Sequence, residues 1–461
     1  MATIVPIETP TLGDRSYLAH DGRVALVVDP QRDIDRVLAL AENAGVRITH
    51  VFETHIHNDY VTGGLALAQA TGAAYCINAA DKVSFERTPI RDSEVVDISS
   101  SLRIRAIATP GHTYTHLSYA LEDGGEPVGV FTGGSLLFGA TGRPDLLGQE
   151  HTFDLVHRQY ASAHRLAGEL PEQAQVLPTH GFGSFCSTGS TGSTSGASAS
   201  TVGEEKRANP ALTQDEERWV AETLAGLDAY PAYYVHMSAA NAAGPRAADL
   251  SLPATADAAT LARRIAGGEW VVDLRTRTAF AAGHAAGTLN FGLDGELSTY
   301  LGWLIPWGTP LTLLGESPDQ ITEAQRELVR IGIDRLAGAA TGTPEDWTDA
   351  PVERLRRATF ADLTQVRHHR GISILDVRQV SEFTAGHIEG AVHVPLGDLL
   401  DRLEDVPDGE VWVHCGSGYR ASVAASVLAA RGHSAENVVV VDDSFDEHAA
   451  ASGLPVVPAK G

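Results

Sequence analysis

The sequence predicts an α/β protein of three domains, and three observations support this class. Its 461 residues correspond to about three ordinary domains, and 43% of them are hydrophobic. Short apolar segments alternate with segments of helical periodicity in the first half, which is typical of a layered α/β domain. A motif in the second half then recurs at a constant offset, which indicates two related domains. We place the domains at residues 1–245, 250–348 and 352–461.

The first domain begins with a predicted hairpin at residues 16–30, and Asp33 is placed to cap the helix that follows. An apolar strand then runs toward His55. Cys76 lies within a later strand and is interpreted as a buried apolar residue. The further elements predicted in this domain are a helix at residues 64–71 and strands at 74–77, 102–108, 117–121 and 128–132.

Three turns of this domain carry histidines. His55, His57 and Asp59 alternate after an apolar strand, so their side chains can point the same way. His112 and His180 each follow a short apolar segment and a turn with proline or glycine. A polar loop is the alternative interpretation of any one turn, but three such turns together predict a metal site.

A tract of Ser, Thr and Gly at residues 184–200 follows the last of these turns, and Cys186 lies near its start. Such a composition cannot bury a core, which predicts a mobile loop. An inert linker is one alternative, and we favour a flap near the metal site. Helical periodicity resumes at residues 201–227, and a small-residue and proline stretch at 239–245 marks the end of the domain.

The repeat in the second half separates Asp273 from Asp376 by 103 residues. Each copy begins with an apolar strand and is expected to form a small parallel sheet. The matched residues are Asp273, Arg275, Phe280, Gly283, His284 and Gly287 in one copy, and Asp376, Arg378, Phe383, Gly386, His387 and Gly390 in the other.

A second chemical site is predicted in the last copy. The apolar strand at residues 411–413 leads through His414 into the loop Cys415-Gly416-Ser417-Gly418-Tyr419-Arg420, which enters a helix. Backbone N–H groups and the helix dipole of such a loop favour a thiolate, and Arg420 adds a cation suited to an anionic sulfur species. When the last helices of the copies are aligned, Gly315 and Gln320 stand opposite Cys415 and Arg420. The first copy therefore lacks the nucleophile.

The net charge of -25, from 59 acidic and 34 basic residues, argues against nucleic acid or an anionic membrane surface as a partner. The beginning of the sequence lacks a basic region followed by an apolar core, and no later stretch is apolar enough to span a bilayer. Three cysteines are too few for a disulfide framework. We therefore expect a cytoplasmic protein, and a homo-oligomer is compatible with the sequence.

The H-x-H-x-D motif and its partner turns resemble the metallo-β-lactamase superfamily. The flanking Gly142-Arg143-Pro144-Asp145 is most similar to persulfide dioxygenases and their glyoxalase II relatives. This resemblance implies an αββα sandwich and a substrate-binding role for Arg143. The D-V-R, G-H-I and C-x-x-x-x-R patterns of the last copy resemble the rhodanese family, which implies that Cys415 carries a persulfide with Arg420 as its catalytic partner. The residues that bind the substrate would be Gly416, Ser417, Gly418 and Tyr419.

Two positions depart from the superfamily pattern. Tyr60 stands where the resemblance implies a histidine of a second metal site. Gly134 stands where it implies an aspartate that bridges the two metals. We therefore predict a mononuclear site formed by His55, His57 and His112, which holds one Fe(II) ion or, alternatively, Zn(II). A further expectation is that Asp59 and His180 form a weak second site or orient the first ligands.

These patterns lead to three functional hypotheses. The first is a persulfide dioxygenase and sulfurtransferase in sulfide and persulfide detoxification. Its partners would be a low-molecular-weight thiol persulfide, O₂, and sulfite or thiosulfate. The second is a zinc-dependent thioester hydrolase similar to glyoxalase II, joined to a rhodanese domain. The third is a non-catalytic metallo-β-lactamase-like scaffold with an active rhodanese domain.

Overall fold

The apolar strands of the first half of the chain pair into two sheets. The computed structural model describes residues 2–181, 183–188 and 198–458, and within this part each of the two sheets has six strands. In the first, β1–β3 are antiparallel and β3–β6 are parallel. Its strands follow sequence order and are β1 (Thr3–Thr9), β2 (Asp14–His20), β3 (Val24–Val28), β4 (Arg47–Phe52), β5 (Ala74–Asn78) and β6 (Thr88–Ile90).

The second sheet has the order β12-β11-β10-β9-β8-β7, and it is antiparallel except where β10 pairs with β11. Side chains such as Phe52, Tyr119 and Phe131 fill the space between the two sheets. The strands are β7 (Val95–Asp97), β8 (Leu102–Ala108), β9 (Leu117–Asp123), β10 (Glu126–Gly133), β11 (Gln175–Pro178) and β12 (Ser200–Thr201).

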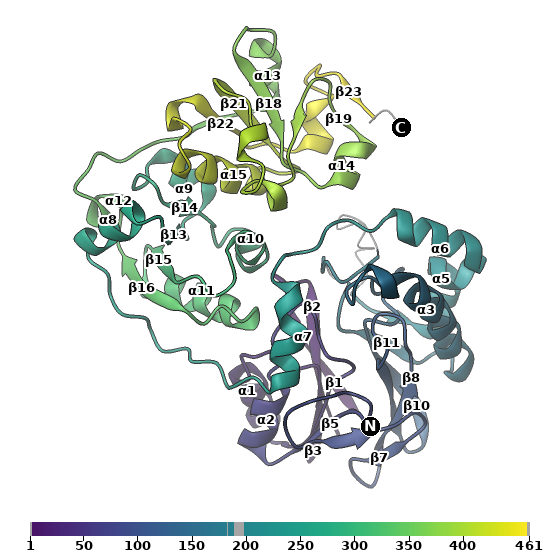
Figure 1. Cartoon of the computed structure of the whole chain (residues 1–461). Coiled ribbons are helices and arrows are strands. Elements are labelled where there is room, and N and C mark those ends of the chain that lie inside the picture. The colour runs from purple at the N-terminus through teal and green to yellow at the C-terminus, as the bar shows by residue number, and fades with distance from the viewer. Residues whose placement is uncertain (1, 182, 189–197, 459–461) are drawn as a thin grey trace. The chain divides into compact units, whose positions relative to one another are not determined.

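Helices cover the outer face of each sheet (Figure 1). On the first sheet lie α1 (Asp35–Ala44) and α2 (Gly64–Thr71), whose apolar faces pack on strand residues such as Val27 and Val51. The second sheet is covered by helices that include α3 (Gln149–Glu169), α4 (Val202–Ala208), α5 (Pro210–Thr213) and α6 (Glu216–Ala225). The layer order helix, sheet, sheet, helix confirms the predicted αββα sandwich.

Most predicted elements of this domain are confirmed, including the hairpin and the helix at 64–71. Cys76 is buried within β5, as expected. The predicted cap by Asp33 is wrong, because α1 begins at Asp35 with Ile34 at its cap and no side-chain cap bond. The carboxylate of Asp33 instead pairs with Arg36 at 2.7 Å. Residues 189–197 of the predicted flap lie outside the described part of the chain.

The described chain divides into two compact units. The first consists of Met1–Asp249 with Val329–Gly332, and it ends with α7 (Tyr234–Ala243). The second consists of Leu250–Leu328 and Ile333–Gly461.

The second unit contains both copies of the repeat. The first copy is a parallel sheet of order β14-β13-β15-β16, with β13 (Trp270–Asp273), β14 (Leu289–Asn290), β15 (Leu311–Gly315) and β16 (Leu336–Thr341). Its helices are α8 (Ala258–Ala266), α9 (Arg277–Ala282), α10 (Leu297–Leu304), α11 (Pro318–Arg330) and α12 (Pro344–Trp347).

The second copy is a parallel sheet of order β17-β22-β21-β18-β20. Its strands are β17 (Arg356–Ala358), β18 (Ile372–Asp376), β20 (Val392–His393), β21 (Glu410–His414) and β22 (Val438–Val441), with β19 (His387–Ile388) and β23 (Val456–Val457) paired separately. Its α-helices are α13 (Phe360–Val366), α14 (Val380–Ala385) and α15 (Tyr419–Ala430).

The repeated Asp and Arg residues have the same structural role in both copies. Arg275 folds back onto the carboxylate of Asp273 at 2.6 Å and donates to the carbonyl of Gly283 at 2.8 Å. Arg378 contacts Asp376 at 2.7 Å in the same way. Each pair ties the end of one strand, β13 or β18, to the end of the helix that follows it, so these motif residues are structural.

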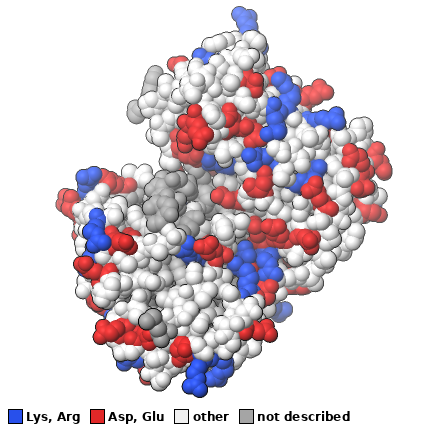
Figure 2. All heavy atoms as spheres, turned by 180° about the vertical axis from the view of Figure 1, so that it is seen from behind, with Lys and Arg blue, Asp and Glu red and all other residues white. Residues whose placement is uncertain are grey.

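The surface carries both signs of charge. On the face shown in Figure 2, Asp and Glu side chains occur in many places, with Lys and Arg side chains between them. Among the described residues, none of the helices combines the length and apolar character that a bilayer span requires.

Candidate metal centre and sulfur-transfer loop

Three of the predicted histidines bring their ring nitrogens together. His55 lies in the loop after β4, His112 after β8 and His180 after β11, and all three are buried. Ligand atoms of His55, His112 and His180 lie within 4.8 Å of one another. The ends of three strands from two sheets therefore meet at one point.

Hydrogen bonds determine which nitrogen of each ring is free. The Nδ1 atom of His112 donates to the carbonyl of Arg143 at 2.8 Å, and that of His180 lies 2.9 Å from the carboxylate of Asp14. The Nδ1 atom of His55 lies 2.9 Å from the hydroxyl of Thr54. Because that hydroxyl donates its own proton to a carboxylate, it must accept from His55.

The Nε2 atoms are therefore the ones that face the common point. Nε2 of His55 lies 3.5 Å from Nε2 of His180, and Nε2 of His112 is buried without a hydrogen-bond partner. Metal-binding histidines typically donate the other ring N–H to a carboxylate or carbonyl, as His112 and His180 do, whereas His55 donates to a hydroxyl. The arrangement fits one metal ion bound by three imidazole nitrogens.

His57 is placed differently. Its Nε2 atom lies 3.2 Å from Asp29, 3.1 Å from Glu53 and 3.0 Å from the hydroxyl of Tyr60. Burial lowers the pKa of His57, but the two carboxylates raise it by more, to about 9. Nδ1 of His57 is buried without a hydrogen-bond partner. His57 lies outside the group formed by His55, His112 and His180, and its expected role as a metal ligand stays a prediction.

Asp59 lies beside His180, with its carboxylate 3.1 Å from Nδ1. Ligand atoms of His57, Asp59 and His180 also lie within 4.8 Å of one another. Burial lowers the pKa of His180, whereas Asp59 and Asp14 raise it well above its usual value. The two carboxylates hold the ring of His180 in position through Nδ1.

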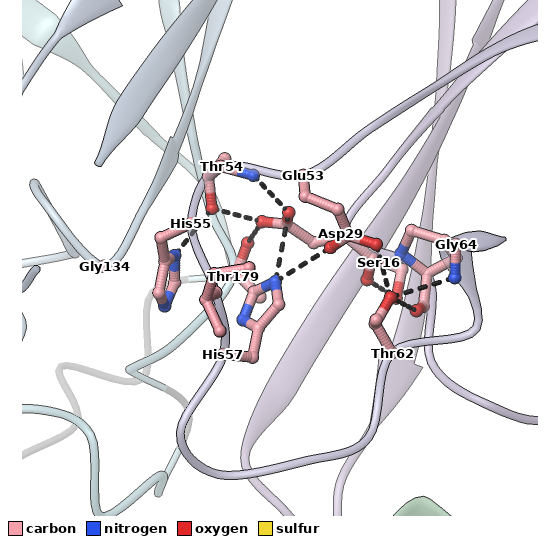
Figure 3. A network of polar contacts seen from close by, with 12 residues as sticks. Ser16, Asp29, Glu53, Thr54, His55, His57, Thr62, Gly64, Gly134 and Thr179 are labelled. Atoms are coloured by element: carbon pink, nitrogen blue, oxygen red, sulfur yellow. Dashed lines mark hydrogen bonds and ion pairs between the residues drawn. The ribbon is translucent and has the colours of Figure 1, made fainter. Parts of the chain in front are cut away.

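Sequence reasoning missed Asp29, which links two of the ligand turns (Figure 3). It follows β3 with a φ of 51°, and its carboxylate accepts from the N–H and the hydroxyl of Thr54, both at 2.7 Å, and from the hydroxyl of Thr179. The turns that carry His55 and His180 are therefore held by one buried carboxylate. The only local signal was an Asp-Pro pair after an apolar strand, which we interpreted as the end of a hairpin.

Gly134 leaves no room for a carboxylate. A Cβ atom at this position would lie 2.3 Å from the His112 ring. The N–H of Gly134 donates to Nε2 of His116 at 3.1 Å, and the ring of His116 stacks on His55 with centroids 5.0 Å apart. His116 is a buried neighbour that sequence reasoning also missed, although it follows His112 by four residues.

The predicted substrate-binding residue Arg143 is only 3% exposed. Its guanidinium is paired at both Nε and Nη2 with Asp145 at 2.7 Å, and Nη2 also donates to the carbonyl of Asp228 at 2.6 Å. Since its carbonyl accepts from His112, the geometry favours a role for Arg143 in positioning that ligand.

The Cys415 loop has the predicted form. It joins β21 to α15, and the N–H of Gly418 donates to Sγ of Cys415 at 3.1 Å. The guanidinium of Arg420 makes a two-point contact with the carboxylate of Glu382 at 2.6 and 2.8 Å. The fork of Arg420, which we expected to suit an anionic sulfur species, is therefore already engaged by a carboxylate. A Cβ atom at Gly416 would lie 3.2 Å from this guanidinium, so glycine permits its close approach.

The equivalent loop of the other copy joins β15 to α11, and the side chain of Gln320 bonds to the backbone of this loop. The amide oxygen of Gln320 accepts from the N–H of Glu316 at 2.8 Å. Pro318 stands where the other loop has Gly418, and proline has no N–H to donate.

Two protein-family models match parts of the chain. Residues 13–180 match the metallo-beta-lactamase superfamily, and residues 359–451 match the rhodanese-like domain. A metallo-beta-lactamase structure from Staphylococcus aureus has a TM-score of 0.65 and 25% identity, covering 74% of this chain and 99% of that one. The chain therefore contains a metallo-β-lactamase domain and a C-terminal rhodanese domain.

Two kinds of curated relative match the first domain at equal identity. A hydroxyacylglutathione hydrolase from Polaromonas is 28% identical over 160 residues, which are 34% of this chain and 57% of the relative, less than two thirds of its length. The mitochondrial persulfide dioxygenase ETHE1 of Bos taurus is 28% identical over 216 residues, which are 46% of this chain and 74% of the relative.

Proposed function

We propose that this chain, which joins a metallo-β-lactamase domain to a rhodanese domain, is a persulfide dioxygenase and sulfurtransferase. Its first domain would oxidise a low-molecular-weight thiol persulfide to sulfite and thiol. Its last domain would transfer sulfane sulfur through Cys415. The observation that supports this combination best is the Cys415 loop, because its chemistry acts on the same class of sulfur compound as the persulfide dioxygenases similar to the first domain.

The ligand set for the first reaction would be His55, His112 and His180, which fit one ion. Fe(II) bound there would supply open coordination positions for the anionic persulfide and for O₂. Asp14 and the carbonyl of Arg143 would hold the ligand rings in orientation through their Nδ1 atoms. Burial of the histidines keeps bulk water from the site.

The second reaction starts from the outer sulfur of a persulfide on Cys415. The lone pair of sulfite attacks this sulfur, and the S–S bond to Cys415 breaks. Thiosulfate leaves and the bonding electrons remain on Sγ as a thiolate. The N–H of Gly418 is placed to stabilise that thiolate. Sulfite made in the first domain would thus be consumed in the last.

A zinc-dependent thioester hydrolase is the second candidate, because hydroxyacylglutathione hydrolases match the chain at the same identity as persulfide dioxygenases. One feature of the site disfavours the dinuclear version of this candidate. The His112 ring lies against Gly134 and leaves no room for a bridging carboxylate.

The test is a metal and substrate comparison on protein purified without oxygen. We expect bound iron and oxygen uptake with glutathione persulfide that continues in the Cys415→Ser variant, which loses sulfur transfer from thiosulfate to cyanide. Zinc with hydrolysis of a glutathione thioester would instead establish the hydrolase. A metal-free protein with neither activity, but with transfer at Cys415, would establish a scaffold.

A further inference from the structure

The guanidinium of Arg420 is bound by a carboxylate at both of its terminal nitrogens. Nη1 donates to Oε2 of Glu382 at 2.6 Å, and Nη2 donates to Oε1 at 2.8 Å. The side chains of Arg420 and Glu382 are 16% and 29% exposed. A guanidinium binds carboxylates and other oxyanions through such a pair of parallel hydrogen bonds. The nitrogens that would bind an oxyanionic substrate at Arg420 are therefore occupied by the protein itself.

This ion pair lies beside the Cys415 loop. Arg420 is in the first turn of α15, which begins directly after Gly418, whose N–H donates to Sγ of Cys415 at 3.1 Å. A Cβ atom at Gly416 would lie 3.2 Å from Nη2 of Arg420 and 3.7 Å from Oε1 of Glu382. Gly416 follows the nucleophile directly. An anion bound at Cys415 is therefore exposed to the cation and to its carboxylate together.

Glu382 also caps α14, but a helix at this place does not require it. Its Oε2 atom accepts from the N–H of Gln379 at 2.9 Å. The offset of the repeat places Ala279 of α9 at the equivalent position (382 − 103 = 279). There the hydroxyl of Thr276 accepts from the N–H of Ala279 at 3.3 Å, and the helix forms without this carboxylate. The fold alone therefore does not explain why α14 carries a glutamate.

The first copy lacks both members of the ion pair. Ala279 stands in the place of Glu382, and Gln320 stands in the place of Arg420. Of the two copies, the one that carries the thiol and the arginine is thus the one that carries the carboxylate. This co-occurrence links Glu382 to the chemistry of Cys415.

We propose that Glu382 determines which sulfur donor the Cys415 site accepts, because it competes with oxyanions for Arg420. Thiosulfate binds through charged oxygens, so at Arg420 it must displace a carboxylate that is held by two hydrogen bonds. The reacting sulfurs of a thiol persulfide carry no oxygen and need no such displacement. The site therefore favours a thiol persulfide as donor and releases thiosulfate as product. This inference rests on the proposed sulfur transfer at Cys415 and names the class of its donor.

The favoured step moves one sulfur atom between two thiols. The thiolate of Cys415 attacks the outer sulfur of the persulfide, and a new S–S bond forms while the S–S bond of the donor breaks. The electron pair of the broken bond leaves on the donor thiolate, which takes the proton of the former persulfide. The products are a persulfide on Cys415 and a free thiol, so no further oxidant or reductant is required.

The decisive variant is Glu382→Gln, which removes the negative charge and keeps an oxygen that accepts from the N–H of Gln379. In sulfur transfer to cyanide we expect the KM for thiosulfate to fall about fivefold, the usual contribution of an ion pair near a protein surface. The KM for glutathione persulfide should change little. Glu382→Ala, which introduces the residue found in α9, should act in the same direction. An unchanged KM for thiosulfate in both variants, or an equal fall for both donors, would overturn the proposal.

Alkylation provides a second measurement that does not depend on turnover. Iodoacetate carries a carboxylate that Arg420 can bind, whereas iodoacetamide is neutral. On the peptide that contains Cys415, the rate with iodoacetate should rise relative to the rate with iodoacetamide in both variants. The same ratio in the variants and the wild type would count against competition for Arg420.

The matched control is Glu204→Gln in the first unit. Glu204 caps α4 by accepting from the N–H of Thr201 at 2.8 Å, so the same exchange is made at the same position of a helix. This variant should leave both KM values and the alkylation ratio unchanged. If the wild type transfers sulfur from neither donor, the proposed function fails, while the alkylation ratio still decides the role of Glu382.

Discussion

At the scale of single residues, the partner of one ring nitrogen decides what the other nitrogen can do. His55, His112 and His180 each have Nδ1 occupied by a hydroxyl, carbonyl or carboxylate oxygen, which leaves Nε2 for a metal. His57 has its Nε2 among Asp29, Glu53 and Tyr60 instead. Ligand atoms of the first three lie within 4.8 Å of one another, whereas His57 belongs to a separate group with Asp59 and His180.

This division predicts opposite results for two alanine variants. His180→Ala should lose most of the bound iron, because one of three ligands is removed. His57→Ala should retain iron with an affinity reduced about tenfold, as is typical when a residue that surrounds the ligands, but does not bind the metal, is removed. Metal analysis of protein loaded without oxygen checks both, with His164→Ala on the exposed side of α3 as control. Iron retained by His180→Ala and lost by His57→Ala would restore the ligand set expected from sequence.

At the scale of elements, two similar loops differ in whether their backbone can hold a sulfur anion. Both follow a central strand of a parallel sheet and lead into a helix. In the loop after β21, Gly418 adopts a φ of 95° and donates to Cys415. In the loop after β15, Pro318 has no N–H, and Gln320 uses the N–H of Glu316. The second loop thus lacks donors as well as a thiol.

We therefore predict that a cysteine alone does not activate the first copy. In a Gly315→Cys, Cys415→Ser double variant, sulfur transfer from thiosulfate to cyanide should remain at the level of Cys415→Ser alone. A Cβ atom at Gly315 also lies only 3.2 Å from the Gln320 amide oxygen, so the new side chain is crowded. Transfer above that background would show that the backbone of this loop is competent. Equal melting temperatures of the double variant and Cys415→Ser would confirm that folding is intact.

At the scale of the whole molecule, the two chemical sites belong to different units of the chain. The histidine cluster lies in the unit that contains Met1–Asp249, and Cys415 lies in the unit that contains Ile333–Gly461. Among the described residues of the second unit, none belongs to a group of side chains suited to hold a metal. The two activities should therefore respond to different treatments.

Metal removal tests this separation. Dialysis against a chelator should abolish oxygen uptake with glutathione persulfide and leave sulfur transfer from thiosulfate to cyanide unchanged. Restoring Fe(II) without oxygen should return the uptake. Alkylation of Cys415 should have the reverse effect on the two assays. Loss of sulfur transfer on metal removal would show that the units are coupled.

Many strands and helices, the parallel sheets of the two copies and the main chemical groups could be predicted from the sequence, although α3 and β1 were not. The pattern of apolar residues predicted β8 and β9, and the sequence repeat predicted the equivalent Asp–Arg pairs of both copies. The loop from Cys415 to Arg420 was recognisable because its glycines, thiol and helix are contiguous. Such features are local, so the spacing of residues along the chain is sufficient to predict them.

The tertiary structure decided which histidines share a metal and what surrounds Cys415. The oxygen that orients His180 belongs to Asp14, which is 166 residues away in the sequence, and the carboxylate that engages Arg420 belongs to Glu382, 38 residues away. The hydrogen bond between Ser422 and Asn290 crosses from one copy to the other. Periodicity predicts that a polar side chain is buried, but a hydrogen bond also needs a partner at the right distance and angle, and only the packed chain supplies it.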